Sequence, residues 1–300
     1  MVDARVRMQP RAEVKPVLKW AGGKRQLLEH ILPVIERCFP DRIEKYYEPF
    51  AGGAAVFFAL SARNKFERAR LSDMNADLIR VYTALRDDAE SVIAELEKLA
   101  ALELSKETYY LVREKVRAKR PGKDAARAAR LIYLNRTGYN GLYRVNSSGE
   151  FNVPYGSYKN PRIVDRPRLL NAAEALQGVE LLVEDFESSC KQAKRGDFVY
   201  FDPPYVPVSK TANFAAYHSV AFASAEHARL AETFARLRKR GVSALLSNSD
   251  TPQTRELYRE FETRTVQATR AINSNASRRG SVPELLVHNE PFKKPKARSR

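Results

Sequence analysis

The chain has 300 residues, of which 44% are hydrophobic and 29% are charged, with a formal net charge of +16. This composition excludes wholesale disorder, and no apolar run approaches the ~20 residues of a membrane helix. The first residues hold charges without an apolar core, so we expect no secretory signal. Two distant cysteines, Cys38 and Cys190, exclude a disulfide framework and a cysteine zinc site, and they indicate a reducing cytoplasm.

The positive charge is regional, which favours a polyanionic partner over general solubility. Residues 106–130 hold nine basic and three acidic side chains, and residues 131–170 hold six basic and two acidic ones. The segments 1–15 and 293–300 add +2 and +5, so the rest of the chain is nearly neutral. We predict flexible basic ends at 1–15 and 291–300, for which a solubilising role is as compatible as a nucleic-acid contact.

Apolar periodicity and glycine or proline breaks predict alternating strands and helices. The first half gives helices at 26–38, 54–63 and 77–86, strands at 46–48 and 69–73, a helix-prone stretch at 90–130, and loops with short hairpins at 135–168. The second half gives strands at 179–183, 197–201, 242–247, 265–269 and 284–288, with helices at 225–240 and 252–261. This order predicts an α/β, Rossmann-like sheet domain (16–88 and 172–290) that is interrupted by a basic insertion at 89–171.

The most informative motif is Asp202-Pro203-Pro204-Tyr205, directly after a predicted strand. Ligands of open α/β sheets bind at the carboxyl ends of strands. The prolines fix the backbone and leave carbonyl acceptors without competing N–H donors. A carboxylate, a carbonyl and an aromatic ring suit a planar exocyclic amine, whereas the alternative interpretation is a rigid turn.

A glycine turn and an acidic strand end precede this motif. Pro49-Phe50-Ala51-Gly52-Gly53 lies between a strand and a helix, where glycines allow a ligand to approach the backbone. It lacks the G-x-G-x-x-G fingerprint, so NAD is not favoured. Asp73 ends the second strand, where nucleotide folds place an acid on a ribose hydroxyl, although an aspartate there is often a helix cap.

Together these segments resemble the Dam-type DNA adenine-N6 methyltransferases, the α-class D12 family. The resemblance spans roughly residues 16–288, in the α order of cofactor motif, recognition region and catalytic motif. It rests on Lys19–Lys24, Pro49–Gly53, Leu71–Asn75, Asn135–Asn146, Gly149–Gly156, Asp202–Tyr205, Ser247–Thr251 and Glu284–Val287. It implies an S-adenosylmethionine-dependent methyltransferase sheet, with residues 89–171 as a helix-and-hairpin target-recognition insertion.

The resemblance also implies roles for individual residues. S-adenosyl-L-methionine is expected at Trp20, Ala21, Gly22, Lys24, Pro49, Phe50, Gly52, Gly53, Asp73, Asn75, Asp185, Phe186 and Asp202. Trp20 has a plain core role as its alternative, and Lys24 that of a solvated charge. For catalysis on a flipped-out adenine, Asp202 and the Pro203 carbonyl would hold the amine hydrogens, Pro204 would fix the turn and Tyr205 would stack on the base. No metal is implied.

Double-stranded DNA is the implied partner, with GATC as the expected target. The resemblance implies that Arg144 reads a guanine, while a sequence-blind phosphate contact is its alternative. The other residues that the resemblance places at DNA are Arg136, Tyr139, Asn140, Leu142, Asn146, Pro154 and Tyr158. We expect a monomer in the bacterial cytoplasm or encoded by a phage. The alternatives are methylation of RNA adenine, DNA cytosine-N4 or a protein glutamine on the same fold, or a non-catalytic DNA-binding module.

Overall fold

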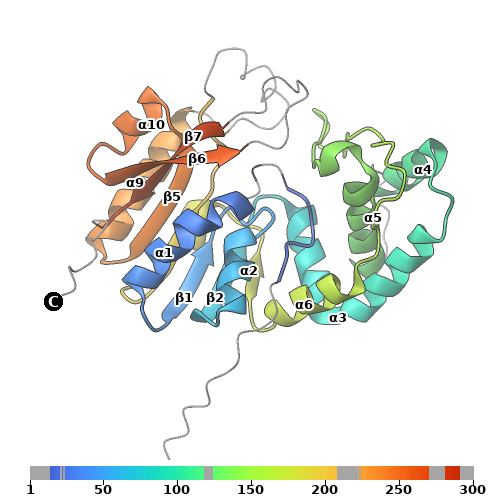
Figure 1. Ribbon diagram of the computed structural model, residues 1–300, viewed down its shortest axis with the longest axis horizontal. Helices are drawn as coiled ribbons and strands as arrows, with labels where there is room; N and C mark the ends of the chain where they lie inside the picture. The colour runs from blue at the N-terminus through green and yellow to red at the C-terminus, as the bar shows by residue number, and fades with distance from the viewer. Residues whose placement is uncertain are drawn as a thin grey trace, which may run out of the picture.

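The computed structural model describes residues 14–20, 22, 24–117, 124–207, 222, 224–269 and 281–290, and its centre is one seven-stranded sheet (Figure 1). The strand order is β3-β2-β1-β4-β5-β7-β6, in which β7 runs antiparallel to both of its neighbours and the other pairs are parallel. The strands are β1 (Ile43–Glu48), β2 (Phe66–Ser72), β3 (Glu180–Leu182), β4 (Phe198–Phe201), β5 (Ser243–Ser249), β6 (Glu262–Thr269) and β7 (Ser281–His288). The predicted α/β, Rossmann-like fold is therefore confirmed.

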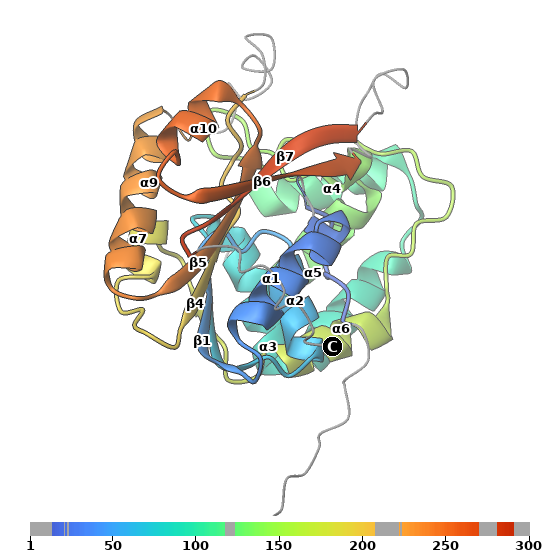
Figure 2. The same ribbon diagram turned by 60° about the vertical axis from the view of Figure 1, so that its left-hand side comes forward.

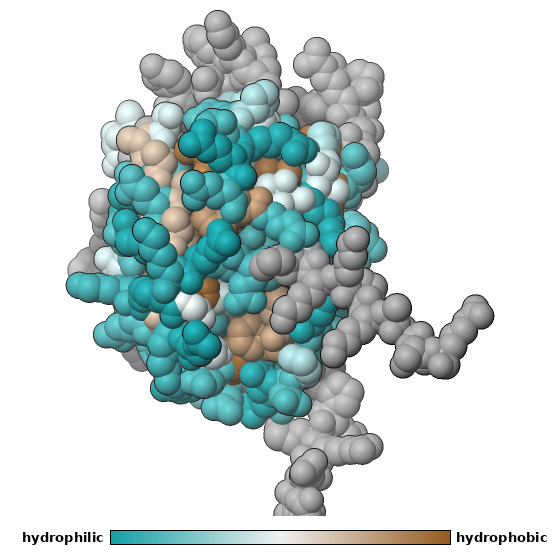
Figure 3. Space-filling model, turned by 90° about the vertical axis from the view of Figure 1, so that its left-hand side faces the viewer, coloured by the Kyte–Doolittle hydropathy of each residue, from teal (hydrophilic) through white to brown (hydrophobic). Residues whose placement is uncertain are grey.

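Helices cover both faces of the sheet, because successive residues of the buried strands point to opposite sides. In β4, Phe198 and Tyr200 join the larger apolar cluster, whereas Val199 and Phe201 join a second cluster with α7 (Phe186–Ser189), α9 (Ser224–Lys239) and α10 (Pro252–Leu257). The larger cluster includes residues of α1 (Leu28–Cys38), α2 (Ala55–Ala62), α3 (Ala76–Ala100), α4 (Lys106–Arg117), α5 (Asp124–Thr137) and α6 (Arg166–Ala175). Seen from the side of α7 and α9, the surface is mostly hydrophilic (Figure 3).

The strand order reverses at β1, which pairs with β2 on one side and with β4 on the other. Since these strands are parallel, their carboxyl ends meet at one edge of the sheet. That edge follows Glu48, Ser72 and Phe201. The crevice at such a switch point is where doubly wound folds bind ligands, so the topology directs attention to the loops that begin there.

The helices α3 to α6 lie between β2 and β3 in the chain and form a lobe beside the sheet (Figures 1 and 2). Helix α3 enters this lobe through a kink at Asp88, whose φ of −155° and ψ of 74° are not helical. Its carboxylate accepts a hydrogen bond from Ser91 N at 3.0 Å, so Asp88 caps the second half of the helix. The kink coincides with the predicted start of the insertion, although the division into domains stays a prediction.

Strands β1 and β2 each begin before the predicted start, and the added part of β1 contains the charged residue Lys45, which is paired. Lys45 in β1 is buried and lies 2.5 Å from the Glu180 carboxylate in β3, and Arg70 in β2 donates to the same carboxylate at 2.7 Å. Charged residues in a sequence usually indicate that a buried strand has ended. Here Glu180 on the neighbouring strand β3 neutralises them, so the strand continues.

In the second half of the chain one predicted helix is too long and one helix was not predicted. The helix predicted at 252–261 ends at Leu257, because Tyr258 leaves the helical conformation and packs, fully buried, between Phe234 and Phe261. Helix α6 falls partly within the predicted loop region 135–168 and partly beyond it. It has Pro167 in its first turn, where proline is well tolerated.

Some expectations fall on residues that the structure does not describe. Ala21 and both predicted basic ends, apart from residues 14 and 15, lie outside the described ranges. Within those ranges, no helix is long and apolar enough to cross a bilayer. The same part of the chain holds no cluster of three or more His, Cys, Asp or Glu side chains suited to a metal ion.

Candidate active site

A lysine and an aspartate form the centre of the site at the carboxyl end of β4. Lys24, which begins the short helix η1 (Lys24–Gln26), is 6% exposed and places its Nζ 2.9 Å from Asp202 Oδ1. The same ammonium donates to Gly22 O at 2.8 Å and lies 4.4 Å from the centre of the Tyr205 ring. The predicted cofactor lysine and the predicted catalytic motif are therefore brought into direct contact.

Asp202 has a second polar neighbour from the adjacent strand β5. Ser247 Oγ donates to Asp202 Oδ1 at 3.2 Å and lies 2.9 Å from Tyr200 OH. Burial raises the pKa of Asp202, while the Lys24 ammonium and the Ser247 hydroxyl oppose this shift. The carboxylate is thus held in a fixed orientation by donors on two different elements.

The Pro-Pro-Tyr turn is fixed from β5 and β7. Tyr205 OH donates to Glu284 Oε2 at 2.6 Å, and Val206 N donates to the fully buried Asn248 Oδ1 at 3.0 Å. Pro203 is buried and Pro204 is exposed. Because the turn is bound at both Tyr205 and Val206, the aromatic ring is held in place beside Asp202.

The glycine turn after β1 is joined to the acidic end of β2. Asp73 accepts hydrogen bonds from Gly52 N at 3.1 Å and from Asn75 N at 2.9 Å. Burial raises the pKa of Asp73, and these two backbone donors oppose the shift. Asn75 in turn caps α3 by accepting from Asp77 N and Leu78 N. Pro49, Phe50, Gly52 and Gly53 thus lie beside the predicted ribose acid, as expected for one cofactor turn.

Trp20 packs directly on this glycine turn and links it to the insertion. A Cβ atom on Gly52 would lie 2.8 Å from Trp20 Cδ1, and the φ of Gly52 is +46°. The other side of Trp20 stacks on Tyr143 with a centroid distance of 5.3 Å, and Tyr143 OH donates to Asp77 Oδ2 at 3.2 Å. Trp20 is therefore held between the glycine turn and Tyr143.

A second connection runs through the backbone of Lys19. Asn135, near the end of α5, accepts from Lys19 N and donates to Lys19 O and Gly141 O, each at 2.8 Å. Lys19 Nζ also lies 5.1 Å from the Tyr158 ring centre, which places Tyr158 beside the N-terminal segment. The Asn135 side chain thus fixes the segment before Lys24 to the end of α5, because it bonds to both backbone polar groups of Lys19.

The predicted DNA-reading residues fall into two groups. Tyr139, Arg144 and Pro154 are exposed, and Tyr139 N donates to Pro154 O at 2.9 Å. Arg144 donates to Asn152 O at 2.6 and 3.1 Å across a short hairpin, in which Val145 bridges to Phe151. The partly buried members of the expected set are Arg136, Asn140, Leu142, Asn146 and Tyr158.

Two predicted residues are occupied elsewhere in the structure. Arg136 points toward the N-terminal segment and donates to Val17 O at 2.6 Å, so the structure does not present it with Arg144. Asp185 caps α7 and pairs with Arg229 at 2.6 Å, while Phe186 is 2% exposed and stacks on Phe50 at 5.5 Å. Phe186 therefore reaches the glycine turn through Phe50, and Asp185 faces α9.

Sequence reasoning gave no role to four residues that build the site. Ser247, Asn248 and Glu284 lie in segments that carried the family resemblance, yet only their contacts with Asp202, Val206 and Tyr205 show what they do. Glu48 ends β1 at 3% exposure and accepts from Tyr46 OH at 2.9 Å and Phe57 N at 3.0 Å. A carboxylate directly after two aromatic residues, Tyr46 and Tyr47, at the predicted end of the strand was the available signal for Glu48.

The buried Glu48 carboxyl predicts a pH dependence of stability. Burial raises its pKa from an ordinary value of 4.5 to about 8. Between these values the folded state keeps a proton that the unfolded state releases, so the free energy of unfolding falls as the pH rises. A Glu48→Gln variant keeps a neutral acceptor, and we expect it to lose less stability than the wild type between pH 5 and 8, by a few kcal/mol.

Urea unfolding at several pH values measures this difference. Glu180→Gln is the matched control, because hydrogen bonds from Lys45 and Arg70 lower the pKa of Glu180 against the effect of its partial burial. Its titration lies below the window from pH 5 to 8, so its slope there should match that of the wild type. Equal slopes for the wild type and Glu48→Gln would contradict a neutral Glu48.

An acidic strand end, a Lys–Asp pair and an Asp-Pro-Pro-Tyr turn meet at the switch point of a doubly wound sheet, a class of fold that binds nucleotide cofactors there. Residues 20–272 match the family described as D12 class N6 adenine-specific DNA methyltransferase. The chain belongs to this family, and the protein is therefore a DNA adenine methyltransferase.

Relatives of known name cover nearly the whole chain. The chain is 41% identical to the type II methyltransferase M1.LlaDCHI of Lactococcus lactis subsp. cremoris, over 92% of this chain and 95% of the relative. It is 42% identical to the type II methyltransferase M.MjaIII of Methanocaldococcus jannaschii, over 92% and 99%. It is 39% identical to the DNA adenine methylase of Escherichia coli K12, over 91% and 95%.

Proposed function

We propose that the protein transfers a methyl group from S-adenosyl-L-methionine to the N6 amine of an adenine flipped out of duplex DNA, within the sequence GATC. The observation that carries this proposal is the contact of Lys24, Asp202 and the Tyr205 ring at the switch point of the sheet. Membership of the family supports methyl transfer to adenine N6 as the reaction. The contact between Lys24, Asp202 and Tyr205 would bind the amine beside the glycine turn.

The residues around the glycine turn fit a nucleoside cofactor. Gly52 leaves no room for a Cβ atom against Trp20, and Asp73 is fixed by two backbone donors while its carboxylate keeps free lone pairs. When bound, the cofactor would supply an electrophilic methyl group on a sulfonium. Asp73 would accept from the ribose hydroxyls, and Trp20 would give the cofactor an apolar wall.

Asp202 and Tyr205 would position the amine. The Asp202 carboxylate and the Pro203 carbonyl would accept the two amine hydrogens, which favours a pyramidal nitrogen with its lone pair toward the methyl group. The Lys24 ammonium lies over one face of the Tyr205 ring, so an extruded adenine would stack on the other face or displace Lys24. Extruding the base costs a few kcal/mol, which stacking on Tyr205 and the two hydrogen bonds would offset.

The hairpin at 142–153 would read the target. Arg144 would exchange its bonds with Asn152 O for a bidentate contact with guanine, worth ~1–3 kcal/mol of discrimination. Leu142 and Pro154 would contact other bases, and Tyr139, which is 44% exposed, would enter the space left by the adenine together with Asn140. We propose that a monomer methylates one strand at a time.

Labelled S-adenosylmethionine and plasmid DNA test this function. We expect label on duplex DNA, protection of GATC sites from a nuclease that methylation blocks, and new cleavage by a nuclease that requires it. RNA and bulk protein, incubated in parallel, should stay unlabelled. Adenine methylation at a different sequence would overturn the GATC assignment alone, whereas label on RNA, on protein or on cytosine would overturn the proposed substrate.

A further inference from the structure

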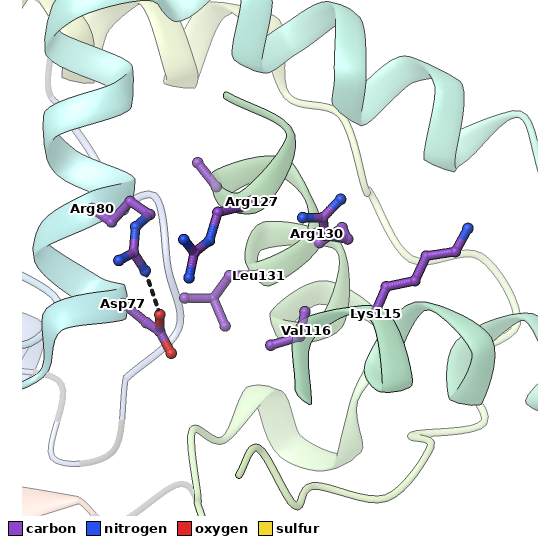
Figure 4. Close-up of a pocket in the computed structure, with 8 residues that line it drawn as sticks. Asp77, Arg80, Lys115, Val116, Arg127, Arg130 and Leu131 are labelled. Carbon is purple, nitrogen blue, oxygen red and sulfur yellow. Dashed lines mark hydrogen bonds and ion pairs between the residues drawn. The ribbon is translucent and has the colours of Figure 1, made fainter. Parts of the chain in front are cut away.

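A narrow cavity opens between α3, α4 and α5, away from the Lys24–Asp202 pair (Figure 4). Its volume is about 20 Å³, which leaves room for about one oxygen-sized atom. Four of its lining residues are cationic and one is acidic, and the set is Asp77, Arg80, Lys115, Val116, Arg127, Ala128, Arg130 and Leu131. The cavity is therefore too small for a nucleoside and strongly positive.

Three of these cations form no pair within the described part of the chain, although Glu95 acts on Arg130 as a more distant favourable charge. Arg127, Arg130 and Lys115 make no hydrogen bond or ion pair with any described residue, and the buried Nε of Arg130 donates to nothing there. A buried N–H without an acceptor costs about 1–3 kcal/mol, so an oxyanion that supplied an acceptor to the Arg130 Nε would recover part of this cost.

The spacing along α5 gathers this charge on one side of the helix. Arg127 and Arg130 are three residues apart, which places them on the same face. Figure 4 shows Arg127 reaching toward Arg80, whose guanidinium is bound to Asp77 at 2.6 Å. Burial and the like charge of Arg127 lower the pKa of Arg130, and Glu95 partly opposes this shift. An oxyanion at the mouth of the cavity would relieve this repulsion.

The cavity adjoins the hairpin that carries the proposed base-reading residues. Asp77 accepts from Arg80 inside the cavity and from Tyr143 OH at 3.2 Å, and Tyr143 directly precedes Arg144. A duplex read by Arg144 would therefore bring its sugar-phosphate backbone near α3 and α5. Phosphate oxygens are acceptors of the required size and charge, and guanidinium groups bind them well.

We propose that this cavity receives a phosphate oxygen of the DNA backbone beside the target site, through Arg127 and Arg130, with Lys115 at its edge. This inference rests on the proposed function only in taking duplex DNA as the partner. The contact is independent of sequence, so it fixes the position of the duplex and carries no base preference.

The test removes the two charges in Arg127→Gln/Arg130→Gln and measures duplex affinity by fluorescence anisotropy over a range of salt concentrations. We expect affinity to fall roughly tenfold or more, equally on duplexes with and without GATC, and the salt slope to decrease by about 1. The matched control is Lys239→Gln/Arg259→Gln on α9 and after α10, which lowers the net charge equally at the opposite side of the molecule (Figure 1). Its affinity and slope should stay close to those of the wild type.

A duplex carrying one neutral methylphosphonate, moved along the backbone, identifies the phosphate. A methylphosphonate at one position should weaken binding by the wild type. The same substitution should not weaken binding by the Arg127→Gln/Arg130→Gln variant. If that variant does not fold, the exposed Lys115→Gln substitution is scanned in the same way and should weaken the effect of that position. Duplex affinity reports this contact and labelling of GATC duplexes by the wild type reports the proposed methyl transfer, so the two proposals can fail separately.

Three outcomes would overturn the inference. The first is an unchanged affinity and salt slope, and the second is a loss confined to GATC duplexes, which would indicate base reading. The third is protection of the wild type against thermal unfolding by inorganic phosphate, at constant ionic strength, with no change in DNA affinity in the variant. That result would assign the cavity to a free anion.

Discussion

An Asp202→Ala variant is expected to lose methyl transfer by roughly 10²–10³-fold or more in kcat, while its DNA affinity stays within a few-fold of the wild type. Asp202 accepts from Lys24 and Ser247 at the carboxyl end of β4, and in the proposed reaction it holds an amine hydrogen. The side chain contributes to a catalytic contact and little to the binding surface. Single-turnover methylation and duplex anisotropy, both at saturating cofactor, measure the two quantities separately.

The matched control lies at the other end of the same strand. Asp197 directly precedes β4 and accepts from Lys194 N at 2.9 Å in a turn. Asp197→Ala removes the same atoms and should lower the free energy of unfolding by about 1 kcal/mol, with kcat per folded molecule unchanged. Normal turnover in Asp202→Ala would reject the role proposed for this residue, and equal losses in both variants would indicate a general structural effect.

The second large effect is expected from Gly52→Ala. Its Cβ would lie 2.8 Å from Trp20 Cδ1 and 3.1 Å from Nε1, and a φ of +46° is unfavourable for alanine by about 1–2 kcal/mol. Trp20 must then leave the glycine turn and its stack on Tyr143. Loss of an apolar contact with a large side chain costs roughly 1.5–3 kcal/mol, and about 1.4 kcal/mol is a factor of ten, so we expect S-adenosylmethionine affinity to fall roughly 10- to 100-fold by calorimetry.

Gly178→Ala is the control that separates the overlap with Trp20 from the strain of a positive φ. Gly178 also has a positive φ, +72°, but nothing lies within 4 Å of an added Cβ. Its stability cost should match only the part of the Gly52→Ala cost that comes from the positive φ, while its cofactor affinity stays that of the wild type. Trp20 is the only tryptophan of the chain, so its fluorescence reports the displacement directly. An unchanged emission spectrum in Gly52→Ala would contradict the expected movement of Trp20.

The sheet and its helices were predictable because their signals are local. Buried strands such as Val242–Ser247, glycine turns and amphipathic helices each leave a pattern within about ten residues. The prediction was wrong where distant partners change the local preference. Lys45 continues β1 because Glu180 neutralises it, and Tyr258 ends α10 because the aromatic cluster around Phe234 buries it.

The motifs of the site could be predicted from the sequence, but the hydrogen bonds and ion pairs that join them could not. The contact between Lys24 and Asp202 joins residues far apart in the chain, and it was expected only because a family resemblance assigned both residues to one cofactor. Ser247, Asn248 and Glu284 support the Pro-Pro-Tyr turn through side-chain hydrogen bonds across strands. Such bonds leave no periodicity in the sequence, so their partners follow only from the register of β4, β5 and β7.

The double attachment of the N-terminal segment to the insertion limits how the protein can be re-engineered. Asn135 pairs with both polar groups of the Lys19 backbone, and Tyr143 stacks on Trp20. The target-reading region is therefore not an exchangeable cassette that ends at residues 89 and 171. A chimaera that imports another enzyme's specificity must also import the donor's version of Val17–Trp20, or mismatched contacts would displace the tryptophan that lies on the glycine turn.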